Sequence, residues 1–261
     1  MDLSNSDIIH IKGKNLEYLQ FRKLNEFGIK HAYTLKNKGY NFKNHGDISI
    51  PDRSYKVLCE ELNLNYDNLV RPDQTHTNVV KCVDKFYKTE ELKDVDGVLT
   101  DKKGISLATT NADCILYLLY DPVKKVVGSI HSGWKGTYLR IIENAIEKMV
   151  NTYKSNISDI FVFICPSIRK CHFEVGSDVK DMFEEKFKFT GKLDEIIFDG
   201  KKEGKYYIDT VHLNNILLMN KGINKNNIID SGLCSVCNSD IIGSYRVEGK
   251  LFTGGTAIIC L

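Results

Sequence analysis

The chain has little proline, almost no net charge and no long apolar run. Its 261 residues include four prolines, and no flexible, glycine- or proline-rich stretch divides them, so we expect one domain covering residues 1–261. Lysine and arginine (36) nearly balance aspartate and glutamate (34), which argues against a nucleic-acid partner because such partners need a wide basic surface. The longest apolar run, 114–120, is too short to cross a bilayer, so no membrane partner is expected.

The first residues lack the basic and apolar regions of a signal peptide. We therefore expect a cytoplasmic, reducing environment. There the eight cysteines would be buried apolar groups, metal ligands or nucleophiles rather than a disulfide framework. The sequence does not determine the oligomeric state, and we favour a monomer.

Hydrophobic periodicity predicts an α+β fold, with mixed β-sheets flanked by helices. Apolar residues recur with helical spacing at 54–62, 137–153, 178–187 and 210–221. Short β-rich runs occur at 30–34, 79–83, 105–109, 114–120, 125–131, 160–165, 241–247 and 256–260. Strands outnumber helices about two to one, and one pair of strands is joined too tightly for a crossover helix, so a purely parallel sheet is disfavoured.

That tightly joined pair, 114–131, is predicted to be a β-hairpin. Pro122 suits the second position of a type I turn, and a four-residue loop at 121–124 would pair Tyr120 with Lys125. In this register Cys114 lies directly opposite His131, with Cβ atoms about 4.5 to 5.5 Å apart. A thiolate and an imidazole so placed can bind one metal ion or each other.

A second histidine, His76, lies in a polar segment just before the β-rich run at 79–83. A single loop histidine is commonly a surface residue. With Cys114 and His131, however, it would complete the three-ligand set of a catalytic zinc that keeps one open position. Copper is a less favoured occupant of the same soft site, and the absence of His-x-His and His-Cys-His patterns argues against a multicopper cluster.

The segment after His131 contains two glycines and leads into a predicted helix. Free backbone N–H groups and the positive end of the helix dipole would suit an anion there, with Lys135 adding charge. Alternatively, the glycines only turn the chain. Trp134 could stack on a flat ligand or fix the loop against the core.

Several short motifs resemble those of a known family. In family order they lie at 74–76 (Gln-Thr-His), 96–98 (Asp-Gly-Val), 111–114 (Asn-Ala-Asp-Cys), 131–136 (His-Ser-Gly-Trp-Lys-Gly), 166–168 (Pro-Ser-Ile), 171–176 (Cys-His-Phe-Glu-Val-Gly) and 244–246 (Ser-Tyr-Arg). These segments resemble the YfiH-type laccase-domain family, also called the multicopper polyphenol oxidase or purine nucleoside phosphorylase family.

The resemblance implies a zinc site at His76, Cys114 and His131, and we therefore expect one Zn²⁺ per chain. It also implies phosphorolysis of adenosine, inosine, guanosine and S-methyl-5'-thioadenosine, together with deamination of adenosine. The expected partners are therefore a purine nucleoside and phosphate. In deamination the metal would activate water for attack on the purine C6.

Two departures from the family pattern concern cations. The family usually has Ser-Thr-Arg where this chain has 34–36 (Thr-Leu-Lys), and Thr-Gly-Arg where it has 253–255 (Thr-Gly-Gly). Lys36 is the candidate replacement for the first arginine, but lysine and arginine do not grip phosphate alike. Phosphorolysis could therefore be weak while deamination survives.

Several further residues are candidates for the site, and most of them have an alternative structural role. The candidate catalytic residues are Asp113, Cys114 and His131. Asp113 would transfer protons or, alternatively, only fix the chain at the end of the strand. Gln74 and Asn111 would contact substrate or satisfy loop backbone. Lys135 and Arg246 would bind phosphate or another anion, although Arg246 could equally form a surface ion pair.

Two other functions remain open. Cys114 and His131 could form a metal-free hydrolase dyad, with a thiolate nucleophile and an imidazole base. The protein could also be a non-enzymatic binding module stabilised by zinc. For the Cys-x-x-Cys at 234–237 we favour two buried thiols over half of a zinc site or a redox pair.

Overall fold

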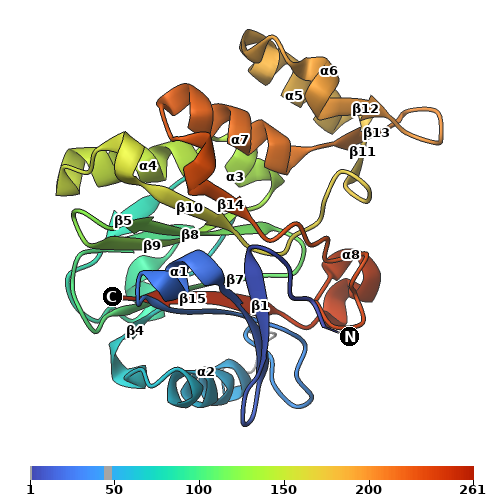
Figure 1. Cartoon of the computed structure of the whole chain (residues 1–261). Coiled ribbons are helices and arrows are strands. Elements are labelled where there is room, and N and C mark those ends of the chain that lie inside the picture. Colours follow the sequence, from blue (N-terminus) through green and yellow to red (C-terminus); the bar gives the residue numbers. More distant parts are fainter. Residues whose placement is uncertain (1, 44–48) are drawn as a thin grey trace.

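Two six-stranded β-sheets packed face to face form the centre of the computed structural model, which describes residues 2–43 and 49–261 (Figure 1). The first sheet contains, in spatial order, β1 (Ile8–Lys12), β2 (Glu17–Phe21), β3 (Lys30–Thr34), β15 (Gly255–Cys260), β7 (Ser106–Asn111) and β4 (Leu69–Val70). The second contains β14 (Ile228–Asp230), β10 (Phe161–Ile164), β8 (Ile115–Asp121), β9 (Val126–Ser132), β6 (Gly97–Thr100) and β5 (Val80–Cys82). Both sheets mix parallel and antiparallel pairs.

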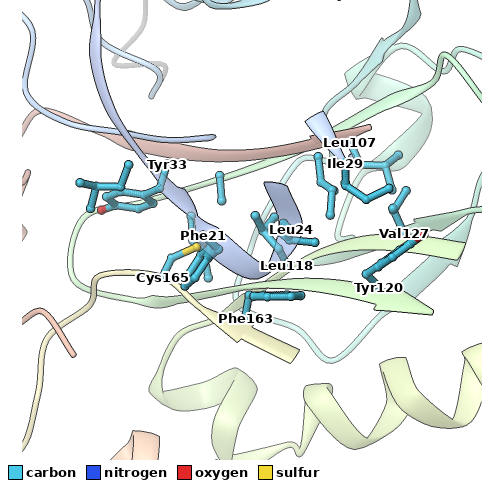
Figure 2. Packing of buried hydrophobic residues seen from close by; sticks show 14 of the residues in the cluster. Phe21, Leu24, Ile29, Tyr33, Leu107, Leu118, Tyr120, Val127, Phe163 and Cys165 are labelled. Atoms are coloured by element: carbon cyan, nitrogen blue, oxygen red, sulfur yellow. The ribbon is translucent and has the colours of Figure 1, made fainter. Parts of the chain in front are cut away.

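The main core fills the space between these sheets. Side chains alternate along β8, so Leu116, Leu118 and Tyr120 face the first sheet and join a cluster with Tyr33 and Leu107 (Figure 2). The intervening side chains of β8 face the helices on the other side. Because β8 is buried on both faces, its sequence is a continuous apolar run rather than an alternating one.

Helices cover the outer faces of both sheets. In Figure 1, α2 (Ser49–Glu61) lies below the paired sheets, and α4 (Ile141–Tyr153) and α7 (Thr210–Lys221) lie above them. The other helices are α1 (Arg22–Glu26), α3 (Trp134–Tyr138), α5 (Ser177–Phe187), α6 (Leu193–Ile196) and α8 (Tyr245–Glu248). Among the described residues, no helix is long and apolar enough to cross a membrane.

A third, small sheet lies at one side of the molecule and packs against α5. Its strands, in spatial order, are β11 (Glu174–Gly176), β13 (Lys205–Ile208) and β12 (Ile197–Asp199). Single 3₁₀ turns occur at Tyr66–Asn68, Thr89–Leu92, Ile157–Asp159, Lys188–Thr190, Lys225–Asn227 and Gly249–Leu251. The α+β class with mixed sheets is thus confirmed.

The predicted elements account for only part of the observed structure. Seven of the eight predicted strands overlap observed ones, but short strands such as β1, β2 and β6 were not predicted. The helical pattern at 137–153 contains the end of α3 and all of α4, because Arg140 between them has a left-handed φ of 61°. Gly222 ends α7 with a φ of 103°, as its position after the helix predicts.

The prediction of a strand at 241–247 is wrong. This segment bends and then forms α8, in which the backbone N–H of Glu248 donates to the carbonyl of Ser244 at 2.9 Å. The Glu248 carboxylate in turn accepts the N–H of Ser244 at 2.9 Å. This local closure outweighs the β propensity of the segment, and Tyr245 and Val247 are left exposed.

The hairpin exists, but its predicted register is wrong by two residues. Asp121 pairs with Val126, and Leu116 rather than Cys114 lies opposite His131. The Asp121 carboxylate accepts the N–H groups of two turn residues at 2.8 and 2.9 Å, so the turn begins one residue later than predicted. An even shift preserves the face on which each side chain lies, so Cys114 and His131 stay on the same side.

His31 of β3 generates a prediction about acid stability. Its ring is fully buried, accepts the N–H of Phe21 at 2.7 Å and contacts the carbonyl of Ile29 at 2.9 Å. Burial lowers the pKa of His31 to about 4. The unfolded chain therefore binds a proton that the folded chain excludes, and we expect His31 to remove about 3 kcal/mol of stability as the pH falls from 6.5 to 4.

Denaturant unfolding at several pH values tests this, and a His31→Leu variant should show a flatter pH dependence. An equally steep dependence in that variant would contradict the prediction.

Candidate active site

The three predicted metal ligands meet at one end of the second sheet. His131 is near the end of β9, Cys114 directly precedes β8, and His76 lies in the loop before β5. Their candidate ligand atoms all lie within 4.8 Å of one another, with 3.8 Å between the His76 Nε2 and the Cys114 Sγ. The two imidazole rings are 4.9 Å apart and nearly perpendicular. His131 is buried and His76 is exposed, so the group opens towards solvent on one side.

A buried carboxylate, Asp96, holds two of these ligands in place. It accepts a hydrogen bond from the His131 Nδ1 at 2.7 Å, and it also accepts the backbone N–H groups of His76 at 3.1 Å and Thr77 at 2.7 Å. The bond to Nδ1 leaves Nε2 as the ring atom of His131 that can bind a metal in place of its proton. Burial opposes ionisation of Asp96, but the bonds from His131 and Thr77 outweigh it and lower the pKa to about 2.

The same carboxylate explains an unusual backbone conformation. His76 has a φ of 67°, in the left-handed region that a residue with a side chain seldom adopts. The bonds from Asp96 to the amides of His76 and Thr77 hold the loop in this conformation. Backbone strain of this kind persists only where surrounding contacts enforce it.

Cys114 and His131 form a charged pair. Burial opposes the thiolate, but the charge of His131 and hydrogen bonds from both histidines outweigh burial and lower the pKa of Cys114 to about 6. Burial likewise opposes protonation of His131, but the Cys114 thiolate and Asp96 raise its pKa to about 9. A thiolate at neutral pH is both a metal ligand and a nucleophile.

The donor set and the space around it fit a zinc ion. Two imidazoles and one thiolate are ligands that zinc prefers, and three protein ligands are the number found in catalytic sites. Gly133 is needed beside them, because a Cβ at this position would lie 2.6 Å from the His76 ring and 3.1 Å from the Cys114 sulfur. Within the part of the chain that the structure describes, no fourth cysteine, histidine or carboxylate joins the group.

A cavity of about 450 Å³ opens beside the three ligands. Its size is in the range of small-molecule sites. Aromatic side chains from three separate segments contribute to its wall: Trp134, Phe173, and the pair Tyr245 and Phe252. Its polar lining includes Lys43, Gln74, Thr110, Asn111, Asp113, Ser132, Thr210 and Arg246. The cavity therefore combines flat apolar surfaces with a small number of polar groups.

Gln74 and Asn111 line the cavity while also bonding to the surrounding backbone. The amide of Gln74 donates to the carbonyl of Thr110 at 2.8 Å and accepts its N–H at 2.7 Å. The amide of Asn111 donates to the carbonyl of Pro166 at 3.1 Å and accepts the hydroxyl of Tyr33 at 3.1 Å. Both residues therefore fix the cavity wall.

Asp113 sits where the chain turns from β7 into β8, with a φ of 87°. One carboxylate oxygen accepts the hydroxyl of Ser235 at 2.6 Å, and the other accepts the backbone N–H of Arg246 at 2.7 Å. The guanidinium of Arg246 donates to the carbonyls of His172 at 2.8 Å and Glu174 at 3.3 Å. Asp113 thus connects three distant segments at the cavity wall.

Two predicted cations do not line the cavity. Lys36 pairs with Glu248 at 3.0 Å, and Lys135 is exposed, with its ammonium 5.7 Å from the centre of the Trp134 ring. The lining cations are Arg246 and Lys43 instead.

Sequence reasoning missed the roles of Lys43 and Asp96. No local pattern marks Lys43, which is positioned by tertiary contacts such as the bond from the Phe42 N–H to the Gly254 carbonyl at 3.2 Å. Asp96 lies in one of the matching motifs, and that motif was the available signal.

Fold and site together define an α+β protein with a Cys-His-His group at the mouth of an aromatic cavity. The family described as multi-copper polyphenol oxidoreductase laccase matches residues 28–261, and the chain belongs to this family.

Individual relatives extend this result. The chain is 30% identical over 218 residues to the purine nucleoside phosphorylase YlmD of Bacillus subtilis, covering 80% of this chain and 76% of that protein. It is 31% identical over 209 residues to the adenosine deaminase RL5 of an unknown prokaryotic organism, covering 76% and 78%. The crystal structure of the hypothetical protein YfiH of Bacillus licheniformis superposes with a TM-score of 0.86 at 27% identity, covering 94% of this chain and 96% of that chain.

The role of Asp96 leads to a testable prediction. Asp96→Asn should lower zinc affinity about 10- to 100-fold, because the amide cannot replace the carboxylate as acceptor for both the His131 ring and the loop amides. Competition with a zinc-binding dye measures this affinity. Asp94→Asn is the matched control, since Asp94 is exposed in the same loop and its side chain accepts the Thr75 hydroxyl at 2.8 Å. Equal affinities in the two variants would contradict the role assigned to Asp96.

Proposed function

We propose that the chain is a zinc-dependent enzyme of purine nucleosides. It catalyses phosphorolysis of adenosine, inosine, guanosine and S-methyl-5'-thioadenosine, and it deaminates adenosine. The observation that carries this proposal is the three-ligand Cys-His-His group beside an aromatic cavity of about 450 Å³. The names of the two relatives, one a phosphorylase and one a deaminase, support both reactions.

The aromatic wall provides the binding surface for the purine. Trp134 begins α3 just after β9, the strand that carries His131, and Phe173 and Tyr245 contribute from the segments that Arg246 joins. Purine rings stack on such side chains with little loss of conformational entropy. The base is thereby held near the ligands at the sheet end, which is a positioning role.

The Cys-His-His residues would hold the zinc, which supplies a Lewis acid and lowers the pKa of a water in the open position. Asp96 keeps the His131 imidazole in the tautomer that a metal requires. Asp113 is the only carboxylate among the cavity-lining residues that the structure describes. It is our candidate for proton transfer, and its bonds to Ser235 and Arg246 hold it at the wall.

Phosphate would be bound by Arg246 and Lys43, the cations that line the cavity. Lys36 and Lys135 do not line it, so neither is assigned this role. Gly255, where the family usually carries arginine, begins β15 and offers no charge. Phosphorolysis is therefore expected to be weaker in this chain than deamination, because phosphorolysis alone requires the anion.

Product analysis with adenosine tests both activities. Deamination yields inosine with or without phosphate, whereas phosphorolysis yields adenine and ribose 1-phosphate only when phosphate is present. Lys43→Ala should raise the KM for phosphate about tenfold, since a charged contact is worth about 1.5 to 3 kcal/mol, and should leave inosine formation unchanged. Lys38→Ala, an exposed lysine in the same segment, is the control. Absence of both products from zinc-loaded protein would refute the proposal.

A metal-free hydrolase is the second candidate, because the lowered pKa of Cys114 and the raised pKa of His131 describe a thiolate–imidazolium pair. The two functions make different use of His76, which is needed by the zinc site but lies outside the dyad. For the zinc enzyme, we expect His76→Ala to lose about one zinc equivalent and most activity, and a chelator to inactivate the wild type until zinc is returned. A dyad would resist the chelator, tolerate His76→Ala and be inactivated by alkylation of Cys114.

Two other interpretations of the Cys-His-His group have less support. A structural zinc in a binding module is closed by four protein ligands, whereas this group has three among the described residues. Copper remains a less favoured occupant than zinc. Elemental analysis of the purified protein distinguishes them, and several tightly bound coppers would argue for a multicopper oxidase instead.

A further inference from the structure

A second group of metal-type ligands lies outside the active-site cavity. It consists of Cys171, His172, Cys234 and Cys237, whose candidate ligand atoms all lie within 4.8 Å of one another. None of the four lines the cavity. The interpretation of the Cys-x-x-Cys as two buried thiols is therefore wrong, because Cys237 is exposed and the motif meets two further ligands.

The distances in this group match the edges of a zinc tetrahedron. With Zn–S near 2.3 Å and Zn–N near 2.0 Å, tetrahedral geometry places two sulfurs about 3.8 Å apart, and a sulfur and a nitrogen about 3.5 Å apart. The Cys171 sulfur is 3.6 Å from that of Cys234 and 3.8 Å from that of Cys237. The Nδ1 of His172 is 3.2, 3.6 and 3.5 Å from the sulfurs of Cys171, Cys234 and Cys237.

The surrounding backbone is also arranged as in a zinc-binding loop. Burial opposes a thiolate at Cys234, but the backbone hydrogen bonds that its sulfur accepts from Cys237, Arg169 and Val236 favour it. The loop itself is fixed, because the N–H of Ser235 donates to the carbonyl of Ser167 at 3.0 Å. On the other side, the N–H of His172 closes a turn onto the carbonyl of Arg169 at 2.9 Å. The backbone of both halves of the group is therefore held in position by hydrogen bonds, one of which joins the two segments directly.

We propose that Cys171, His172, Cys234 and Cys237 bind a structural Zn²⁺, separate from the metal of the active site. Three thiolates and one imidazole are a common closed set for such an ion, which leaves no position for substrate. The ion joins two segments that are 63 residues apart in the sequence. One leads into the small sheet through β11, and the other follows β14 of the second sheet.

This zinc would support the wall of the cavity. Ser235, inside the Cys-x-x-Cys, donates its hydroxyl to Asp113 at 2.6 Å. The carbonyl of the ligand His172 accepts the guanidinium of Arg246 at 2.8 Å. Joining the two segments therefore fixes the positions of Asp113 and Arg246.

Metal content of matched variants tests the proposal. The wild-type chain should contain two zinc equivalents, one at each site, and Cys237→Ser should lose one of them. Cys237→His, which supplies a nitrogen ligand in place of the sulfur, should keep both, and so should Cys82→Ser, whose thiol lies outside the group. Cys237→Ser should also melt at a lower temperature than Cys82→Ser, because a bound ion stabilises only the folded chain. Equal zinc content in Cys237→Ser and wild type would overturn the proposal.

Two measurements separate this site from the active site and from a redox pair. In His76→Ala, Co²⁺ should still give tetrahedral d–d bands and thiolate-to-cobalt charge transfer, even where nucleoside turnover is absent. In His76→Ala, an organomercurial that titrates thiols should release one zinc equivalent to an indicator dye, whereas in the wild-type chain it should release two, because Cys114 also reacts. A disulfide among the three cysteines, found by mass spectrometry in metal-replete protein purified without oxidant, would overturn the site.

Discussion

The buried carboxylate of Asp96 is the group on which the candidate active site depends. A fully buried charge is tolerated only where hydrogen bonds replace its lost hydration, and here the donors are the His131 ring and the backbone of the loop at 75–77. The loop therefore folds around the carboxylate, and His76 accepts a left-handed conformation as a result. One buried charge thus positions two of the three ligands and fixes the tautomer of one of them.

The paired sheets provide the rigid frame for this arrangement. β8 is buried on both faces, and its neighbour β9 carries His131 at its end. Cys114 precedes β8 at the same edge, next to the end of β7, where Asn111 is bonded to Tyr33. Because the strands are held by packing on both faces, the polar groups at their ends need little further ordering. A site built on such strands keeps its geometry better than one built on free loops.

The two thiol–imidazole groups differ in the number of ligands and in surroundings. The group at His76 has three ligands and opens into a cavity, whereas the group at Cys171 has four and lies outside it. Asp113 links them, since it adjoins Cys114 in sequence and is bonded to Ser235 beside Cys234. The difference between an open and a closed ligand set is the physical basis for assigning catalysis to one and stability to the other.

By itself, the sequence determined the α+β class, seven of the eight predicted strands and the grouping of His76, Cys114 and His131, because periodicity is local and the motifs are short. Only the tertiary structure decided the register of the hairpin, where hydrogen bonds to Asp121 moved the turn by one residue. It also decided that 241–247 forms α8, that Lys43 lines the cavity and that Cys171 meets Cys234 across 63 residues. Contacts between distant segments depend on how whole layers pack, and a local pattern of residues carries no record of that packing.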